Sequence, residues 1–275
     1  MTVLGAGHGP STLEAVVLSL DEMQFLLEKL EIEVPVVLNA RGRYDNVTHH
    51  KAAMDVAAES LIQRELLIDD VVHLDLEDRL RALNRPHWII ALRLVVDGYV
   101  SRFCLAKSDD LSVVTLRGQD SYVIDEAGTD LPGTVLAALG YAEPLELYGM
   151  NAPTDQLATI FAATGDAAAT AERLTKVGNP AHDARTLAAA LVEIHSYAEV
   201  VGVMYGDGTR DAADNHIAVF NTRAGRFIAT ASKSDDGVKW TSLSSGTTAR
   251  LRAAVQDLIS SLPEREDFPR NPKLS

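Results

Sequence analysis

The chain has 275 residues, 47% of them hydrophobic and 23% charged, which is typical of a folded globular protein and not of a disordered one. Its net charge of −14 repels phosphate backbones, and no window mixes clustered lysine and arginine with aromatic residues, so we expect no nucleic-acid binding. No stretch approaches the roughly 20 apolar residues that span a bilayer, so we expect no membrane insertion. The first residues lack the basic and apolar segments of a signal peptide, which predicts a cytoplasmic protein. Cys104 is the single cysteine, so an intramolecular disulfide is excluded.

The first half of the chain is predicted to contain a strand, three helices, an antiparallel meander and a closing helix. A strand is expected over 13–20, followed by a helix with Asp21 as its N-cap and a second helix from Thr48 towards Leu66. A third helix, 76–83, ends before Pro86. Short runs rich in β-branched and aromatic residues then predict four strands, and Gly140 ends a helix over 131–139. These runs are 88–96, 99–106, 111–117 and 121–126.

The second half is predicted to repeat that order, with a small helical bundle in place of the first helices. Alanine-rich segments over 152–163, 166–177 and 181–194 have helical spacing, with Pro153 and Asp183 near their starts. Four short runs then predict strands, and a helix over 247–262 ends at Pro263. These runs are 196–205, 216–221, 225–232 and 238–243.

Two similar halves imply one continuous sheet, because each isolated meander would leave exposed edges and an uncovered apolar face. We therefore predict an α/β (α+β) fold with one central, mainly antiparallel sheet and helical bundles, its halves related by pseudo-twofold symmetry. The halves are about 13–150 and 151–263 within a single domain 1–275, with flexible ends at 1–11 and 264–275. Two independent domains are the alternative.

The sequence shows no motif for catalysis or for binding a cofactor or metal. The P-loop, nucleophile-elbow and HExxH patterns are missing, and the glycines of GAGHGP precede any strand. His49 and His50 are adjacent and diverge on a helix, while His182 with Asp183 is a two-residue coincidence. We expect no catalytic, cofactor-binding or metal-binding residue.

The segment 206–215 is the nearest candidate for a calcium loop. Counted from Asp207, however, the sixth residue is Ala212 and the twelfth is Ala218, where an EF-hand needs glycine and glutamate. We interpret it as a solvated hairpin loop between two strands.

The last third of the chain resembles the C-terminal part of the EspG family of type VII secretion chaperones. The resemblance lies in YAEVV (197–201), NTRAGRFIA (221–229) and WTSLSSGTTARLRAAVQDLISSLP (240–263). Asn221 and Ser245 depart from the family pattern, which has aspartate and proline there, and the first half agrees mainly in HWIIALRLVVDGYVSRFCLA (87–106). The residues that match the pattern are Tyr197, Glu199, Thr222, Gly225, Arg226, Trp240, Gly246, Leu258, Leu262 and Pro263.

This resemblance implies a cytosolic chaperone that binds the PPE subunit of PE/PPE heterodimers, keeps it soluble and targets it to type VII secretion. It implies no catalysis and no cofactor, and a monomer or weak homodimer is expected. It also implies a partner surface in three places, although apolar residues at helical spacing are more often core. These places are the turn Asp97, Gly98 and Tyr99, the bundle residues Leu157, Ile160 and Phe161, and a loop with Thr230, Ser232 and Lys233.

Two alternatives stay open at this point. One is a metal-dependent or carboxylate enzyme that uses the acidic loops, which elemental analysis and thermal shifts with divalent ions would reveal. The other is a structural oligomer that pairs through an open sheet edge, which light scattering at several concentrations would detect.

Overall fold

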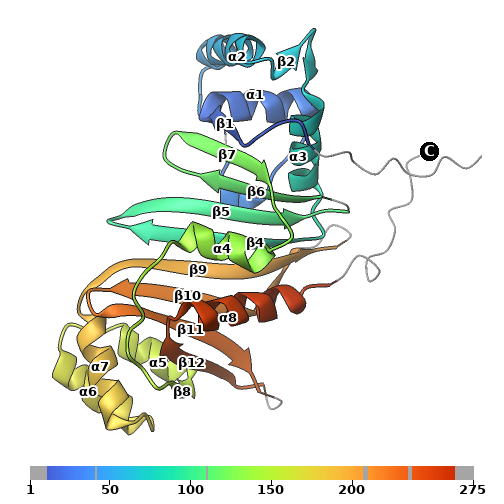
Figure 1. Ribbon diagram of the computed structural model, residues 1–275. Helices are drawn as coiled ribbons and strands as arrows, with labels where there is room; N and C mark the ends of the chain where they lie inside the picture. Colours follow the sequence, from blue (N-terminus) through green and yellow to red (C-terminus); the bar gives the residue numbers. More distant parts are fainter. Residues whose placement is uncertain (1–10, 41, 110, 207–209, 235–236, 264–275) are drawn as a thin grey trace, which may run out of the picture.

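A ten-stranded, fully antiparallel sheet organises the computed structural model, which describes residues 11–40, 42–109, 111–206, 210–234 and 237–263 (Figure 1). The strand order is β1-β7-β6-β5-β4-β9-β10-β11-β12-β8, which confirms the predicted central antiparallel sheet. The strands are β1 (Val16–Ser19), β4 (Trp88–Val96), β5 (Tyr99–Lys107), β6 (Ser112–Arg117), β7 (Ser121–Glu126), β8 (Met150–Pro153), β9 (Ile194–Tyr205), β10 (Arg210–Thr222), β11 (Gly225–Lys233) and β12 (Lys239–Ser245). A separate hairpin joins β2 (Leu67–Ile68) to β3 (Val71–Val72).

The strand order relates the two halves to each other. The meanders β4 to β7 and β9 to β12 meet at the centre, where β4 pairs antiparallel with β9. In each half, the strand at the outer edge of the sheet precedes the helices in the chain. β1 pairs with β7 at one edge, and β8 pairs with β12 at the other. The sequence analysis missed β8. With it, each half contains an edge strand, three helices, four strands and a closing helix, which agrees with the predicted similarity of the halves.

The helices begin close to the expected positions, but two caps differ. Ser19, not Asp21, caps α1, because its hydroxyl accepts from the Glu22 N–H at 3.1 Å and the Glu22 carboxylate accepts from the Ser19 N–H at 2.7 Å. Asn46, not Thr48, caps α2. The helices are α1 (Leu20–Leu30), the short 3-10 helix η1 (Val36–Leu38), α2 (Val47–Gln63), α3 (Leu74–Asn84), α4 (Leu131–Leu139), α5 (Thr154–Phe161), α6 (Ala167–Lys176), α7 (Ala181–Leu191) and α8 (Thr248–Ser260).

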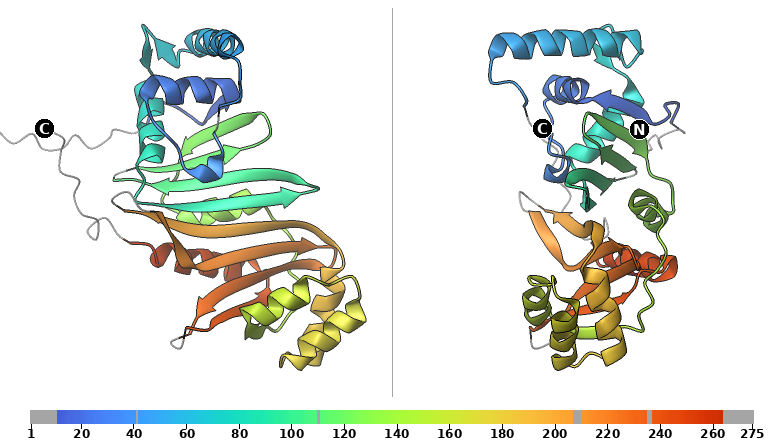
Figure 2. Two further views of the ribbon diagram at one scale, coloured as in Figure 1. Left: turned by 180° about the vertical axis from the view of Figure 1, so that it is seen from behind. Right: turned by 90° about the vertical axis from the view of Figure 1, so that its left-hand side faces the viewer.

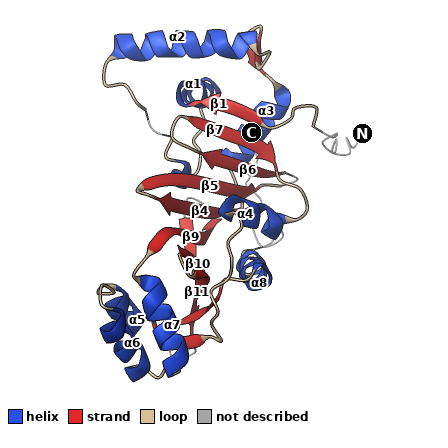
Figure 3. Ribbon diagram, turned by 60° about the vertical axis from the view of Figure 1, so that its left-hand side comes forward, coloured by secondary structure: helices blue, strands red, loops and turns tan. Residues whose placement is uncertain are grey.

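One face of the sheet is covered across its centre by α4 and α8, and we call it the covered face (Figures 2 and 3). Side chains alternate between the two faces along a strand. On β9, Ala198 and Val200 point to this face and are buried, as are Phe103 on β5 and Ile217 on β10. The two helices also contact each other, with Arg252 paired to Asp130 at 2.6 Å. This face is therefore closed by the chain itself.

The opposite face is covered by helices at its two ends and, over part of β4 to β6, by η1. One core cluster packs α1 to α3 against the β1 side, and another packs α5 to α7 against the β8 side (Figure 3). Between them, Tyr197 and Glu199 of β9 remain exposed, although their neighbours Ala198 and Val200 are buried. We call this central area the open face. The strand register places on it Ala91, Arg93, Val95, Val100, Arg102, Arg117, Tyr197, Glu199, Val201, His216, Ala218 and Phe220.

Much of the resemblance motif forms a structural junction on the covered side. The buried Arg226 side chain donates to the carbonyls of Gly140 and Leu139 at the end of α4, and to Asn221 Oδ1 at 2.7 Å. Gly246 lies so close to Arg226 that a Cβ atom would come within 2.3 Å of its Cγ. The motif residues here therefore fix the fold and do not contribute to the open face.

Candidate functional site

The predicted turn of Asp97, Gly98 and Tyr99 is a tight hairpin between β4 and β5. Asp97 and Gly98 have φ angles of +49° and +82°, as a two-residue turn of the primed type requires, and Tyr99 is largely exposed. The next pair of strand residues, Val95 and Val100, belongs to the open face. The turn thus lies at one end of that face.

The predicted bundle residues divide between core and surface. Leu157 and Ile160 are only 3% and 4% exposed and belong to the α5–α7 core. Phe161 is partly buried and packs edge-to-face on Phe220, with ring centroids 6.4 Å apart. Of these three side chains, only Phe161 therefore lies beside the open face.

The prediction that Thr230, Ser232 and Lys233 lie in a loop is wrong, because they belong to β11 and pair with β12. Alternation along the strand directs Thr230 and Ser232 to the same side as Ile228, which is part of the covered-face core. Lys233 points to the other side. The end of β11 has a polar sequence that is typical of a loop. Pairing with β12 nevertheless extends the strand beyond its apolar part, which explains the error.

The open face carries a row of basic side chains that the sequence analysis did not identify. Arg93 of β4 is directly opposite Arg102 of β5, which is directly opposite Arg117 of β6. On the other side of Arg93, the row continues with Glu199 of β9. Each arginine belongs to a strand of mostly uncharged residues, and the short hairpins would have allowed their alignment to be predicted.

This row contains more basic than acidic side chains, and its members differ in burial. Arg93 and Glu199 approach to 3.7 Å, and both side chains are about half exposed, so this ion pair contributes little. Burial, and then the charges of Arg117 and Arg93, hold the pKa of Arg102 below its usual value. Arg117 lies over the Tyr122 ring, 5.7 Å from its centroid. The row is therefore a locally positive strip on an acidic protein.

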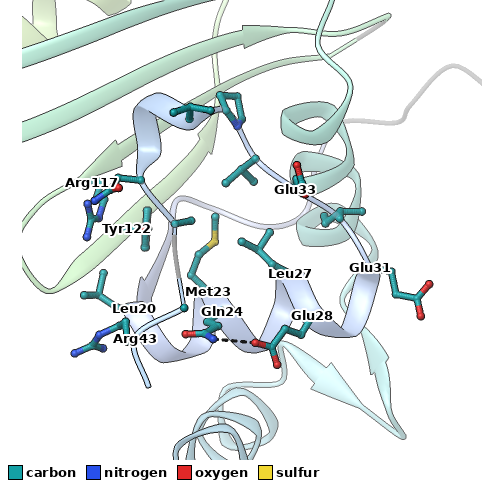
Figure 4. Close-up of a pocket in the computed structure, with 17 residues that line it drawn as sticks. Leu20, Met23, Gln24, Leu27, Glu28, Glu31, Glu33, Arg43, Arg117 and Tyr122 are labelled. Atoms are coloured by element: carbon teal, nitrogen blue, oxygen red, sulfur yellow. Dashed lines mark hydrogen bonds between the residues drawn. The ribbon is translucent and has the colours of Figure 1, made fainter. Parts of the chain in front are cut away.

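Two hollows border the row. The smaller, about 360 Å³, lies between η1 and the sheet, and Arg93, Arg102, Asn39 and Val201 are among its lining residues. The larger, about 620 Å³, lies between α1 and residues 31–40, 42 and 43, with Arg117 and Tyr122 on one side and Glu28, Glu31 and Glu33 on the other (Figure 4). Both hollows are open to solvent and lined by mixed polar and apolar groups, which suits contact with protein side chains.

The acidic segment 206–215 differs from the predicted loop. Asp207 lies outside the described residues, but β10 already begins at Arg210 and pairs with β9 up to an irregularity between Ala212 and His216. Asp211 and Asp214 are therefore strand residues. Within the described residues, no three His, Cys, Asp or Glu side chains are grouped closely enough to hold a metal ion. None of the helices in the described part of the chain combines the length and apolar composition that a bilayer crossing requires.

Comparison with known proteins gives concordant results. A solved structure titled as the Mycobacterium tuberculosis type VII secretion system chaperone EspG5 in complex with a PE25-PPE41 dimer has the same fold, with a TM-score of 0.74 and 16% identity over 90% of this chain and 97% of that one. The ESX-3 secretion-associated protein EspG3 of Mycobacterium tuberculosis (strain CDC 1551 / Oshkosh) is 22% identical over 94% of this chain and 95% of its own length. The model of the EspG family matches residues 19–257. This chain belongs to the EspG family.

Proposed function

We propose that this protein is a cytoplasmic chaperone that binds the PPE subunit of PE/PPE heterodimers, keeps it soluble and targets it to type VII secretion without catalysing a reaction. Membership of the EspG family supports this function, as does the shared fold with a chaperone solved together with a PE-PPE dimer. The family also supports a role in protein binding over the enzyme alternative. No bound group is needed for such a role, because burial of apolar surface supplies the driving force.

The observation that carries the proposal is the open face. An antiparallel sheet with one solvated face ordinarily carries polar side chains there, yet the aromatic side chain of Tyr197 on this face is 41% exposed. Phe220 and Val201 lie on the same face and are only partly buried. Apolar and aromatic side chains surrounded by charged groups are the usual composition of a protein-binding surface. A helical segment lying across the strands would bury them.

The shape of the site fits a helical end better than an extended peptide. Strand addition needs an unpaired sheet edge. The exposed surface lies instead at the centre of the sheet, where β4 and β9 each already pair with a strand on both sides. The helices α1 to α3 and α5 to α7 stand at the two ends of this surface (Figure 3). A helical tip could therefore contact the sheet and both groups of helices.

Co-expression with PE/PPE pairs and affinity capture would test this function. We expect the wild-type chain to capture a pair and Tyr197→Ala to bind it at least about tenfold more weakly, as for a central aromatic contact. Tyr141→Ala is the matched control, because Tyr141 is also exposed but lies after α4 and hydrogen-bonds Glu143. If no pair is captured, or if both variants bind like the wild type, the proposed function or its assignment to the open face is wrong.

A further inference from the structure

The arginine row is the least expected charge arrangement in the molecule. The chain carries 39 acidic against 25 basic residues, yet Arg93, Arg102 and Arg117 stand directly opposite one another on three neighbouring strands. Side chains in directly opposite positions are close, and like charges placed this way destabilise a sheet. Among the described residues, Glu199 is the one acidic side chain that forms an ion pair with the row, which leaves an excess of two positive charges in the row.

Other buried or half-buried arginines have partners that account for their positions. Arg79 donates through its terminal nitrogens to the carbonyls of Leu13 and Glu14, although its Nε–H has no partner, and Arg64 donates to the Glu22 carboxylate at 2.9 Å. In the part of the chain that the structure describes, Arg102 has neither an ion pair nor a side-chain hydrogen bond, and the buried Nε of Arg117 has no hydrogen-bond partner. The Nε–H of Arg117 therefore carries the cost of a buried donor without an acceptor.

We propose that the row is an anionic anchor site, in which Arg102 and its neighbours bind an acidic side chain of the helical segment docked on the open face. This inference rests on the proposed function and names one element of the partner's recognition. A guanidinium presents a planar fork of N–H donors that matches a carboxylate in two parallel hydrogen bonds. The unsatisfied donors of the row would thereby gain their acceptors when the partner binds.

The surroundings favour a single carboxylate over a phosphate or a nucleic acid. Glu199 is part of the row, and its charge opposes a dianion more than a monoanion. The net charge of −14 repels an extended polyanion. Tyr197 and Val201 flank Glu199 on the open face, so the anion must arrive together with apolar surface. An Asp or Glu side chain on an amphipathic helix meets these conditions.

Binding of the PE/PPE pair that the wild-type chain captures is the first test, measured by calorimetry for Arg102→Gln at low and high salt. We expect at least a tenfold loss of affinity at low salt, a weaker salt dependence, and an unfolding midpoint that is unchanged or higher because a repulsion is removed. The matched control is Arg250→Gln, the same charge change on the exposed surface of α8, with binding within about twofold of wild type. Wild-type affinity and salt dependence in Arg102→Gln would overturn the inference while leaving the proposed function intact.

A second test needs no partner and uses acetate as a monocarboxylate probe. In ¹⁵N-arginine NMR spectra, acetate should shift the Nε–H signals of Arg93, Arg102 and Arg117 in the wild-type chain and in Arg250→Gln, at an ionic strength matched with chloride. Arg102→Gln should lose the shifts of the two remaining arginines. If acetate acts no differently from chloride, the row is not a carboxylate site. If acetate binds but no PE/PPE pair is captured, the anion site stands and the proposed function is at fault.

Discussion

The two faces of the sheet are built from the same strands but have opposite relations to solvent. Along β9, Ala198 and Val200 are buried under α4 and α8, whereas Tyr197 and Glu199 between them are exposed. The covered face gains its stability within the chain, and the open face leaves apolar surface that only another molecule can bury. The contrast teaches that one strand can serve stability and binding at once, because its side chains alternate.

The arginines of the two faces show the same contrast. Arg226 on the covered face is buried and donates to two carbonyls and an amide oxygen, so its charge is solvated by the protein. Arg102 on the open face has no such acceptor among the described residues. Burial lowers the pKa of both groups, but for Arg102 neighbouring positive charges add to the effect. The first arginine holds the fold together, and the second is left for an external anion.

The largest expected effect is on the covered face. Phe103→Ala should reduce the free energy of unfolding by about 3–5 kcal/mol, because a side chain that is 1% exposed leaves a cavity between β5 and the helices. Tyr197→Ala on the open face should cost only about 1 kcal/mol. Urea denaturation of both variants measures the difference. Equal losses would mean that the faces are not distinct in stability.

The second effect concerns the junction that anchors α4. Arg226→Met keeps the unbranched apolar stem of the side chain but leaves the acceptors at Gly140, Leu139 and Asn221 without their donor, and we expect a loss of about 2–4 kcal/mol. Arg223→Met in the adjacent exposed turn should stay within about 0.5 kcal/mol, since its pair with Glu193 is a surface contact at 3.8 Å. Thermal unfolding of the two variants checks this. A small effect in Arg226→Met would show that the junction is dispensable.

Trp240 marks where the covered face ends. Trp240 is 38% exposed on β12. Leu243, on the same strand, points to the opposite side of the sheet and is buried. Trp240→Ala should therefore cost about 1–2 kcal/mol. From the sequence alone, a core position would have implied about 3–5 kcal/mol. Calorimetric unfolding decides between these values, and the higher one would place the indole under more cover than the structure shows.

The smallest effect is a gain. Asn221→Asp would place a carboxylate beside Arg226 Nε. The Ser196 Oγ now accepts from Asn221 Nδ2, and its hydroxyl would rotate to donate to the new carboxylate, so we expect about 0.5–1.5 kcal/mol more stability at neutral pH. The guanidinium would lower the folded-state pKa of the new carboxyl below its unfolded value of about 3.9. The gain is therefore present above that unfolded pKa and is lost as pH falls through the folded pKa. Unfolding at pH 7 and pH 3 measures it, and a loss at pH 7 would contradict the prediction.

Periodicity predicted most of the strands and helices, because β4 to β7 and α8 have clear apolar patterns. β8 was missed since MNAP is short, contains Pro153 and has no alternation that stands out. The N-terminal part of β10 was taken for a loop because its residues Asp211, Ala212 and Asp214 have low strand propensity, and pairing with the long β9 overrides it.

The candidate site was less predictable. Apolar spacing alone could not separate the buried Leu157 and Ile160 from the partly exposed Phe161. The open face exists because α4 and α8 both lie on the other side, and a one-dimensional pattern does not state on which side a helix packs. The alignment of the arginines across β4 to β6 is the one part of the site that could have been predicted, from the lengths of the turns and the alternation of side chains along each strand.

The two margins of the sheet are short. β1 and β8 each contain four residues, and β8 includes Pro153, which has no N–H to donate. Few unpaired backbone groups are therefore presented to another extended chain, and self-templated fibre growth through these margins is disfavoured. The protein can therefore expose apolar side chains at the centre of its sheet without polymerising through the sheet edges.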